Sequence, residues 1–97
     1  MTDDQTLSKD LGMPRLTLHP LQKIRYSIPR FGTVRGILWR MEIPNAPATY
    51  AIELKGMGYR RLRVIGRDPF VARKLFALLA KHTVTPFGLA DVADEWT

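Results

Sequence analysis

The sequence of 97 residues contains no cysteine and no long run of apolar residues. The absence of cysteine excludes a disulfide framework, a cysteine-ligated zinc site and thiol chemistry, and it fits a reducing cytoplasm. A membrane-spanning helix needs about 20 consecutive apolar residues, which no segment approaches, and the polar N-terminus has no signal-peptide core. These absences predict a soluble cytoplasmic protein that does not associate with a membrane.

Acidic residues are scarce in the middle of the chain. Residues 22–82 carry thirteen lysines and arginines against only Glu42, Glu53 and Asp68, and the whole chain has a formal net charge of +6. A basic body of this kind attracts nucleic acid, anionic surfaces or acidic protein partners, without specifying which. The length of the chain leaves room for one domain only.

Recognisable catalytic motifs are also lacking. The two histidines, His19 and His82, have no partners at the spacing of a metal site. The segment 56–58 (Gly-Met-Gly) lies between two expected strands rather than before a helix, so we interpret it as a hairpin turn and not as a phosphate-binding loop. We therefore expect a protein that is not an enzyme and that needs neither a metal nor another cofactor.

Three acidic residues, Asp91, Asp94 and Glu95, lie close together near the C-terminus. Paired carboxylates serve in acid–base catalysis, but a surface cluster beside a basic body is more often an ion-pairing element. Negative charge near the end of a helix opposes the helix dipole, so it requires compensating cations or a partner. We hypothesise that this tail folds back toward arginines of the body.

The residue pattern predicts a single α+β domain over residues 21–97, preceded by a flexible leader over residues 1–20. Apolar and polar residues alternate over 23–28, 33–43, 50–55 and 61–65. The connections between these segments are short, which predicts an antiparallel meander of about four strands. Leu16 and Leu18 alternate as well, so the end of the leader is a candidate for a short edge strand.

Two helices are expected after the strands. Asp68 and Pro69 are typical of a helix cap and a first helical position, and an amphipathic helix follows them. Its apolar stripe is formed by Val71, Leu75, Leu78, Leu79 and His82. Thr85 and Pro86 repeat the cap signal and predict a shorter helix over residues 87–96. We expect the helices to cover one face of the sheet.

Strand alternation assigns the side chains to two faces. The face that the helices bury is expected to contain Ile24, Tyr26, Ile28, Ile52, Leu54, Leu62 and Val64. The opposite face would then present a cluster of cations, namely Lys23, Arg25, Lys55, Arg61 and Arg63. Like charges on neighbouring strands repel, so an uncovered cluster of this kind is a candidate surface for phosphates or for an acidic partner.

Two alternatives for this basic face remain open. Arginines on a β-ribbon can contact phosphates and reach guanine edges in the major groove. A charged face can also serve only to keep the sheet soluble and to block pairing at its edges. Single-stranded nucleic acid would require exposed aromatic residues, for which only Tyr59 and Phe31 are candidates.

Four large apolar residues have no assigned place in the expected core. Trp39 and Met41 belong to the second expected strand, and Phe76 and Trp96 lie off the main apolar stripe of the helix. They either enlarge the core or form an exposed patch. Tryptophan and methionine are enriched at protein interfaces, so an exposed patch would indicate a homodimer or an apolar protein partner.

The C-terminal segment 84–96 resembles the ending of a family of short, uncharacterised bacterial domains. The matching positions are Thr85, Pro86, Leu89, Asp91, Val92, Asp94, Glu95 and Trp96. Gly88 stands where that family has a histidine, so no role of that histidine transfers to this chain. The resemblance implies a small, soluble bacterial α+β domain and brings no activity with it.

Two functional hypotheses follow from these observations. The first is a small non-enzymatic binding module, regulatory or accessory, that acts through contacts with an acidic or apolar protein partner or with a second copy of itself. The alternative is a nucleic-acid-binding domain that uses the basic sheet face.

Overall fold

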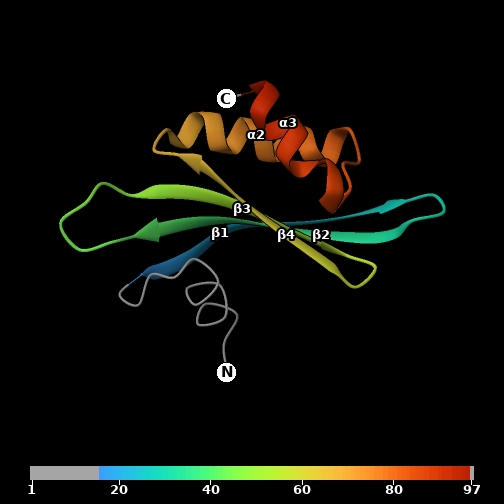
Figure 1. The fold of residues 1–97 in the computed structure, drawn as a ribbon, viewed down its shortest axis with the longest axis horizontal. Helices are drawn as coiled ribbons and strands as arrows, with labels where there is room; N and C mark the ends of the chain where they lie inside the picture. Colours follow the sequence, from blue (N-terminus) through green and yellow to red (C-terminus); the bar gives the residue numbers. More distant parts are fainter. Residues whose placement is uncertain (1–15, 97) are drawn as a thin grey trace.

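The computed structural model describes residues 16–96. Its elements are β1 (Thr17–Ile28), β2 (Gly32–Glu42), β3 (Thr49–Gly56), β4 (Tyr59–Gly66), α2 (Pro69–Lys81), the 3₁₀ turn η1 (Pro86–Gly88) and α3 (Leu89–Trp96). The strands form one antiparallel sheet in the order β1-β2-β3-β4. Figure 1 shows the sheet strongly twisted, with both helices on one side of it. The predicted α+β meander with two C-terminal helices is confirmed.

Strand β1 is longer than predicted, because it includes part of the expected leader. Thr17 pairs with Glu42 at the start of β1, and the register shifts between Pro20 and Gln22. Proline has no N–H to donate, and it is tolerated here because β1 lies at the edge of the sheet. The remainder of the predicted leader, residues 1–15, lies outside the described residues.

Helix α2 begins where the sequence predicts. The Asp68 side chain accepts hydrogen bonds from the backbone N–H groups of Phe70 and Val71, and Pro69 occupies the first helical turn. The shorter helix begins at Leu89, two residues later than predicted, because the 3₁₀ turn η1 occupies residues 86–88, and the Thr85 side chain makes no cap hydrogen bond. Among the described residues, no helix combines the length and the apolar character that crossing a membrane requires.

The main core lies between the sheet and the helices. Its buried residues are Val34, Leu38, Ile52, Leu54, Ala72, Leu75, Phe76, Leu79, Leu89 and Ala93. Gly36 makes this packing possible, since a Cβ there would lie 2.9 Å from Ile24 Cγ1 and 3.0 Å from Leu54 Cδ2. The side chains of β1 and β3 therefore meet directly over the backbone of β2.

The predicted helix stripe is partly wrong. Leu75 and Leu79 are buried, but Ala72 and Phe76 complete the buried face, while His82 is exposed. Phe76 is fully buried although the sequence placed it off the stripe. Positions 72, 75, 76 and 79 follow the spacing of one helix face, so the buried stripe of α2 is rotated relative to the predicted one.

The two faces of β4 are the reverse of the prediction. Leu62 pairs with Glu53 and Arg61 pairs with Leu54, so Leu62 lies on the face away from the helices and Arg61 on the helix side. The cause is the two-residue turn, in which Met57 and Gly58 both adopt positive φ and Gly56 pairs with Tyr59. A turn of this length fixes the register of the hairpin and hence which side chains share a face.

A second core lies on the side of the sheet away from the helices. Leu18, Trp39, Met41 and Ala51 are buried there, and Leu16, Ile37 and Leu62 pack against them. Trp39 is only 2% exposed. Trp39, Met41 and Phe76 therefore belong to the two cores and form no exposed patch; of the four candidates, only Trp96 is about half exposed, at 49%.

Tyr26 links the edge strand β1 to the segment after α2. Its hydroxyl donates a 2.5 Å hydrogen bond to the backbone carbonyl of Val84, and burial raises the pKa of Tyr26 from 10.0 to about 12. A group whose pKa is raised by folding stabilises the protein below its unfolded pKa and loses that contribution as pH rises toward the folded value.

We expect Tyr26→Phe to lower the free energy of unfolding by about 1 kcal/mol at pH 7, because it removes one hydrogen bond. The difference between the two proteins should shrink between pH 10 and 12, where the wild type alone loses the Tyr26 contribution. Urea unfolding of both proteins at several pH values measures this. A difference that stays constant up to pH 12 would contradict the assignment.

Candidate functional site

Four cations lie side by side across the whole sheet, one on each strand. Arg25 of β1 pairs with Arg35 of β2, Arg35 pairs with Lys55 of β3, and Lys55 pairs with Arg60 of β4. Neighbouring strands are about 4.8 Å apart, so these side chains form a continuous line, which we call the cationic row. Lys23 lies two residues from Arg25 on the same face of β1.

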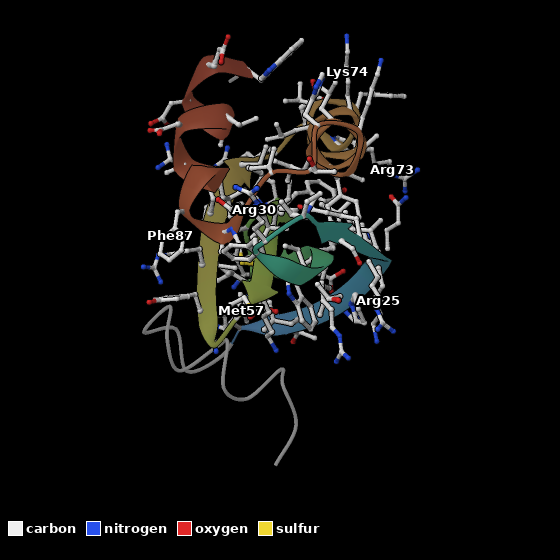
Figure 2. The ribbon with its side chains drawn as sticks, turned by 90° about the vertical axis from the view of Figure 1, so that its right-hand side faces the viewer. Arg25, Arg30, Met57, Arg73, Lys74 and Phe87 are labelled. Atoms are coloured by element: carbon white, nitrogen blue, oxygen red, sulfur yellow. The ribbon has the colours of Figure 1, made fainter. Side chains whose placement is uncertain are left out.

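The cationic row faces away from the helices. Its neighbours in sequence on β1 and β3, Ile24 and Leu54, point into the main core, and alternate residues of a strand point to opposite sides. Figure 2 shows Arg25 on the side of the sheet opposite to Lys74 of α2. Arg25 and Arg35 are exposed, while Lys55 and Arg60 are half-buried.

The structure brings three of the five predicted cations together. Lys23, Arg25 and Lys55 share the outer face with Arg35 and Arg60, which sequence reasoning missed. The placement of Arg61 and Arg63 on this face is wrong, because the register of β4 turns both to the helix side. The length of each turn fixes which residues of neighbouring strands lie opposite each other, and this register identifies the row.

Arg63 instead holds the C-terminal helix. Its guanidinium Nη2 donates to Oδ1 of Asp94 in α3. The hypothesis that the acidic tail folds back toward an arginine of the body is confirmed by this contact. Both side chains are substantially exposed, so the pair contributes less than about 1 kcal/mol to stability.

One buried carboxylate lies next to the cationic row. Glu53 is 3% exposed and is the only buried charged side chain among the described residues. Its Oε2 is 3.0 Å from Arg60 Nε, and its Oε1 is 3.9 Å from Lys55 Nζ. Oε1 also accepts a 3.4 Å hydrogen bond from Trp39 Nε1. Glu53 thus orients two members of the row and connects them to the second core.

In the described part of the chain, the remaining cations of this face have no carboxylate beside them to compensate their charge. Within residues 16–96, none of the ion pairs involves Lys23, Arg25 or Arg35. Arg35 lies directly opposite a cation on both sides, and like charges in directly opposed positions are destabilising. This arrangement costs stability in the isolated protein.

We therefore expect Arg35→Gln to raise the free energy of unfolding by about 0.5 kcal/mol at low ionic strength, because it relieves two repulsive contacts. Salt should abolish the gain, since exposed charges are screened. Thermal unfolding of both proteins at low and high NaCl concentration measures the effect. A loss of stability in Arg35→Gln at low salt would show that Arg35 has a compensating contact.

The cationic row borders two shallow hollows. One, of about 410 Å³, is lined by Lys23, Ile24, Arg25, Arg35, Gly36, Ile37 and Lys55. The other, of about 440 Å³, is lined by Thr33, Arg35, Lys55, Gly56, Met57, Gly58, Tyr59 and Arg60. The tips of the two hairpins meet beside the second hollow, where a Cβ on Gly32 would lie 2.9 Å from Met57 Sδ. Arg35 and Lys55 belong to both hollows.

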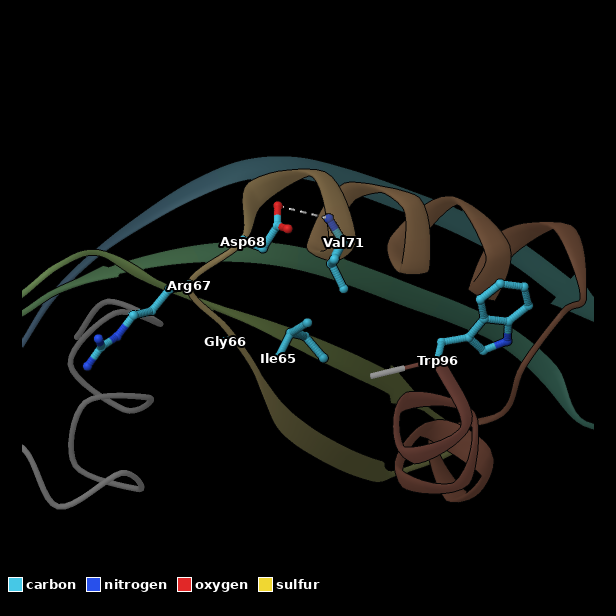
Figure 3. Close-up of a pocket in the computed structure, with 6 residues that line it drawn as sticks. All are labelled: Ile65, Gly66, Arg67, Asp68, Val71 and Trp96. Carbon is cyan, nitrogen blue, oxygen red and sulfur yellow. Dashed lines mark hydrogen bonds between the residues drawn. The ribbon is translucent and has the colours of Figure 1, made fainter.

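A third hollow, of about 230 Å³, lies between the start of α2 and the end of α3 (Figure 3). Trp96, Ile65 and Val71 supply its apolar part. Its one carboxylate, Asp68, already accepts hydrogen bonds as the cap of α2, and Arg67 points away from Trp96. This hollow offers an apolar contact surface and little chemistry.

The described residues offer no metal site. Within residues 16–96, no three histidine or acidic side chains are grouped so that they could hold an ion. His19 Nε2 lies 3.5 Å from Glu42 Oε2, and Glu42 also pairs with Arg40. His82 ends α2, with its backbone N–H bonded to the Leu78 carbonyl. Neither histidine lines any of the three hollows described above.

Comparison with protein-family models, with curated proteins and with solved structures finds no match to this chain.

Proposed function

We propose that this protein is a small, non-enzymatic, cytoplasmic module that binds nucleic acid through the cationic row. The register that aligns Arg25, Arg35, Lys55 and Arg60 is the observation that carries the proposal. Nucleic acid carries phosphates at regular spacing along a chain, so it can neutralise several members of a row at once. Release of condensed counterions supplies the free energy of this kind of binding.

Three features support contact with phosphates rather than a merely soluble surface. A soluble protein surface typically intersperses charges of both signs, whereas the row places like charges in opposed positions. Arg25 and Arg35 are exposed and line a concave surface with Lys55. Glu53 orients Lys55 and Arg60 from below, so part of the surface is ordered before a ligand arrives.

The alternative proposal, contact with a protein partner or a second copy, has less support. Trp39, Met41 and Phe76 are buried and are not accessible to a partner. Trp96 remains, in the small hollow with Ile65 and Val71. This surface favours at most a limited apolar contact, so we place the protein-contact function second.

The test is the salt dependence of binding to a labelled oligonucleotide, measured by fluorescence anisotropy. With about four phosphates neutralised, the logarithm of the association constant should fall with the logarithm of salt concentration with a slope of about −3 for a single strand. Absence of binding at low salt, or affinity that does not depend on salt, would overturn the proposal.

A further inference from the structure

An aromatic cluster adjoins one end of the cationic row. It consists of Phe31 from the turn between β1 and β2, Tyr59 from the start of β4, and Phe87 from η1. The Tyr59 and Phe87 ring centroids are 4.5 Å apart at 63°, and those of Phe31 and Phe87 are 6.5 Å apart at 87°. Tyr59 is 48% exposed and Phe87 is 50% exposed. Figure 2 shows Phe87 beside β4.

Arg61 lies over the two exposed rings. Its Cζ is 5.3 Å from the centroid of Phe87 and 6.0 Å from that of Tyr59. Its Nη1 donates a 2.9 Å hydrogen bond to the carbonyl of Arg60, which fixes the guanidinium close to the backbone of the edge strand. A cation is therefore held beside the aromatic surface in addition to those of the row.

Tyr59 connects the aromatic cluster to the cationic row. It lines the same hollow as Arg35, Lys55 and Arg60. Tyr59 and Arg60 are consecutive residues of β4, and consecutive strand residues point to opposite sides of a sheet. A ligand that crosses the β4 edge at the hairpin tip would contact the rings on one side and the cations on the other.

We propose that Tyr59 and Phe87 form a stacking platform for bases of single-stranded nucleic acid whose phosphates lie along the cationic row. This inference rests on the proposed function and names its substrate class. Only unpaired bases present their faces to a protein, whereas a duplex keeps them stacked and paired. A basic groove combined with exposed aromatic rings is the arrangement that binds single strands with little sequence preference. Arg61 supplies a further cation for the phosphate beside the stacked base.

The test compares two single-stranded probes that differ only in their bases. One is an oligothymidylate of about 12 nucleotides, within the span that one small domain covers, and the other is an abasic oligomer with the same number of phosphates. We expect the wild type to bind oligothymidylate at least about tenfold more tightly than the abasic oligomer, because stacking contributes only to the first.

Variants test whether the two aromatic rings cause the difference in affinity between the two oligomers. Tyr59→Leu and Phe87→Leu should each weaken oligothymidylate binding about tenfold, leave the abasic oligomer unaffected and leave the salt slope unchanged. Tyr59→Phe keeps the ring and should bind like the wild type. Phe70→Leu removes an aromatic residue that is 83% exposed on α2, away from the row, and should have no effect.

The two proposals fail in different ways. Equal affinity of the wild type for both oligomers would overturn the stacking platform alone, and this comparison requires no variant to fold. Loss of affinity for both oligomers in Tyr59→Leu would also overturn it, because a base-independent loss is not stacking. Failure of the wild type to bind either oligomer would overturn the proposed function and the platform together.

Discussion

Replacing both Arg25 and Arg35 by glutamate is expected to weaken the affinity for a single-stranded oligonucleotide about 100-fold at low salt, because two phosphate contacts are lost and two repulsive ones are created. The fold should persist, since both side chains are exposed and take part in none of the ion pairs among residues 16–96. Circular dichroism and thermal unfolding check the fold, and fluorescence anisotropy measures the affinity.

A matched control separates the position of the charges from the net charge. Arg73→Glu combined with Lys74→Glu makes the same change in net charge on the exposed side of α2, as Figure 2 shows for these two side chains. We expect a loss of only a few-fold from the weaker long-range field. An equal loss in both double variants would show that binding responds to overall charge and not to the cationic row.

Replacing Phe76 by alanine is expected to destabilise the fold by about 3–5 kcal/mol, because it leaves a cavity in the main core. A small domain has a total stability of similar size, so much of the protein should be unfolded at room temperature. Phe76 has no exposed surface, and Ala72, Leu75 and Leu79 pack around it on the same helix.

Phe70→Ala is the matched control for Phe76→Ala. It deletes the same side chain from the same helix at a position that is 83% exposed, and should change stability by less than about 0.5 kcal/mol. Urea unfolding of both variants measures the contrast. Comparable losses in the two would mean that α2 presents a different face to the sheet.

Most of the fold could be predicted from local signals. Alternation over short segments predicts the strands, and the Asp68–Pro69 and Thr85–Pro86 pairs predict where the helical segments after the sheet begin. These signals act within a few residues of the chain, through the geometry of a single strand or helix. The main fold class therefore follows without knowledge of any tertiary contact.

The faces of β4 could not be predicted from hydrophobicity alone. Hydrophobicity places Leu62 and Val64 in the core only if one face of the sheet alone is buried. The structure has a second core around Trp39, so apolar residues occur on both faces of the sheet. Alternation alone therefore does not indicate which face of β4 lies toward the helices. The two-residue turn at Met57 and Gly58 contains the missing information, since it pairs Leu54 with Arg61.

The candidate site depends on contacts between distant segments. Local sequence does not identify Arg35, because its importance lies in the residues opposite to it, Arg25 and Lys55, and not in its own neighbours in sequence. Of the two aromatic candidates that the sequence offers, Tyr59 is exposed, whereas Phe31 is half-buried against the main core. Phe87, which lies between them in space, belongs to a 3₁₀ turn whose position against β4 no local pattern indicates.

The most direct test of the cationic row is the salt slope of oligonucleotide binding in Arg25→Gln combined with Arg35→Gln. If both arginines neutralise phosphates, removing them should reduce the slope by about 1.4, or 0.7 for each contact with a single strand. The same variant should be at least as stable as the wild type, because it relieves the repulsion within the row. A slope equal to that of the wild type would contradict the assignment of the row as the phosphate-binding surface.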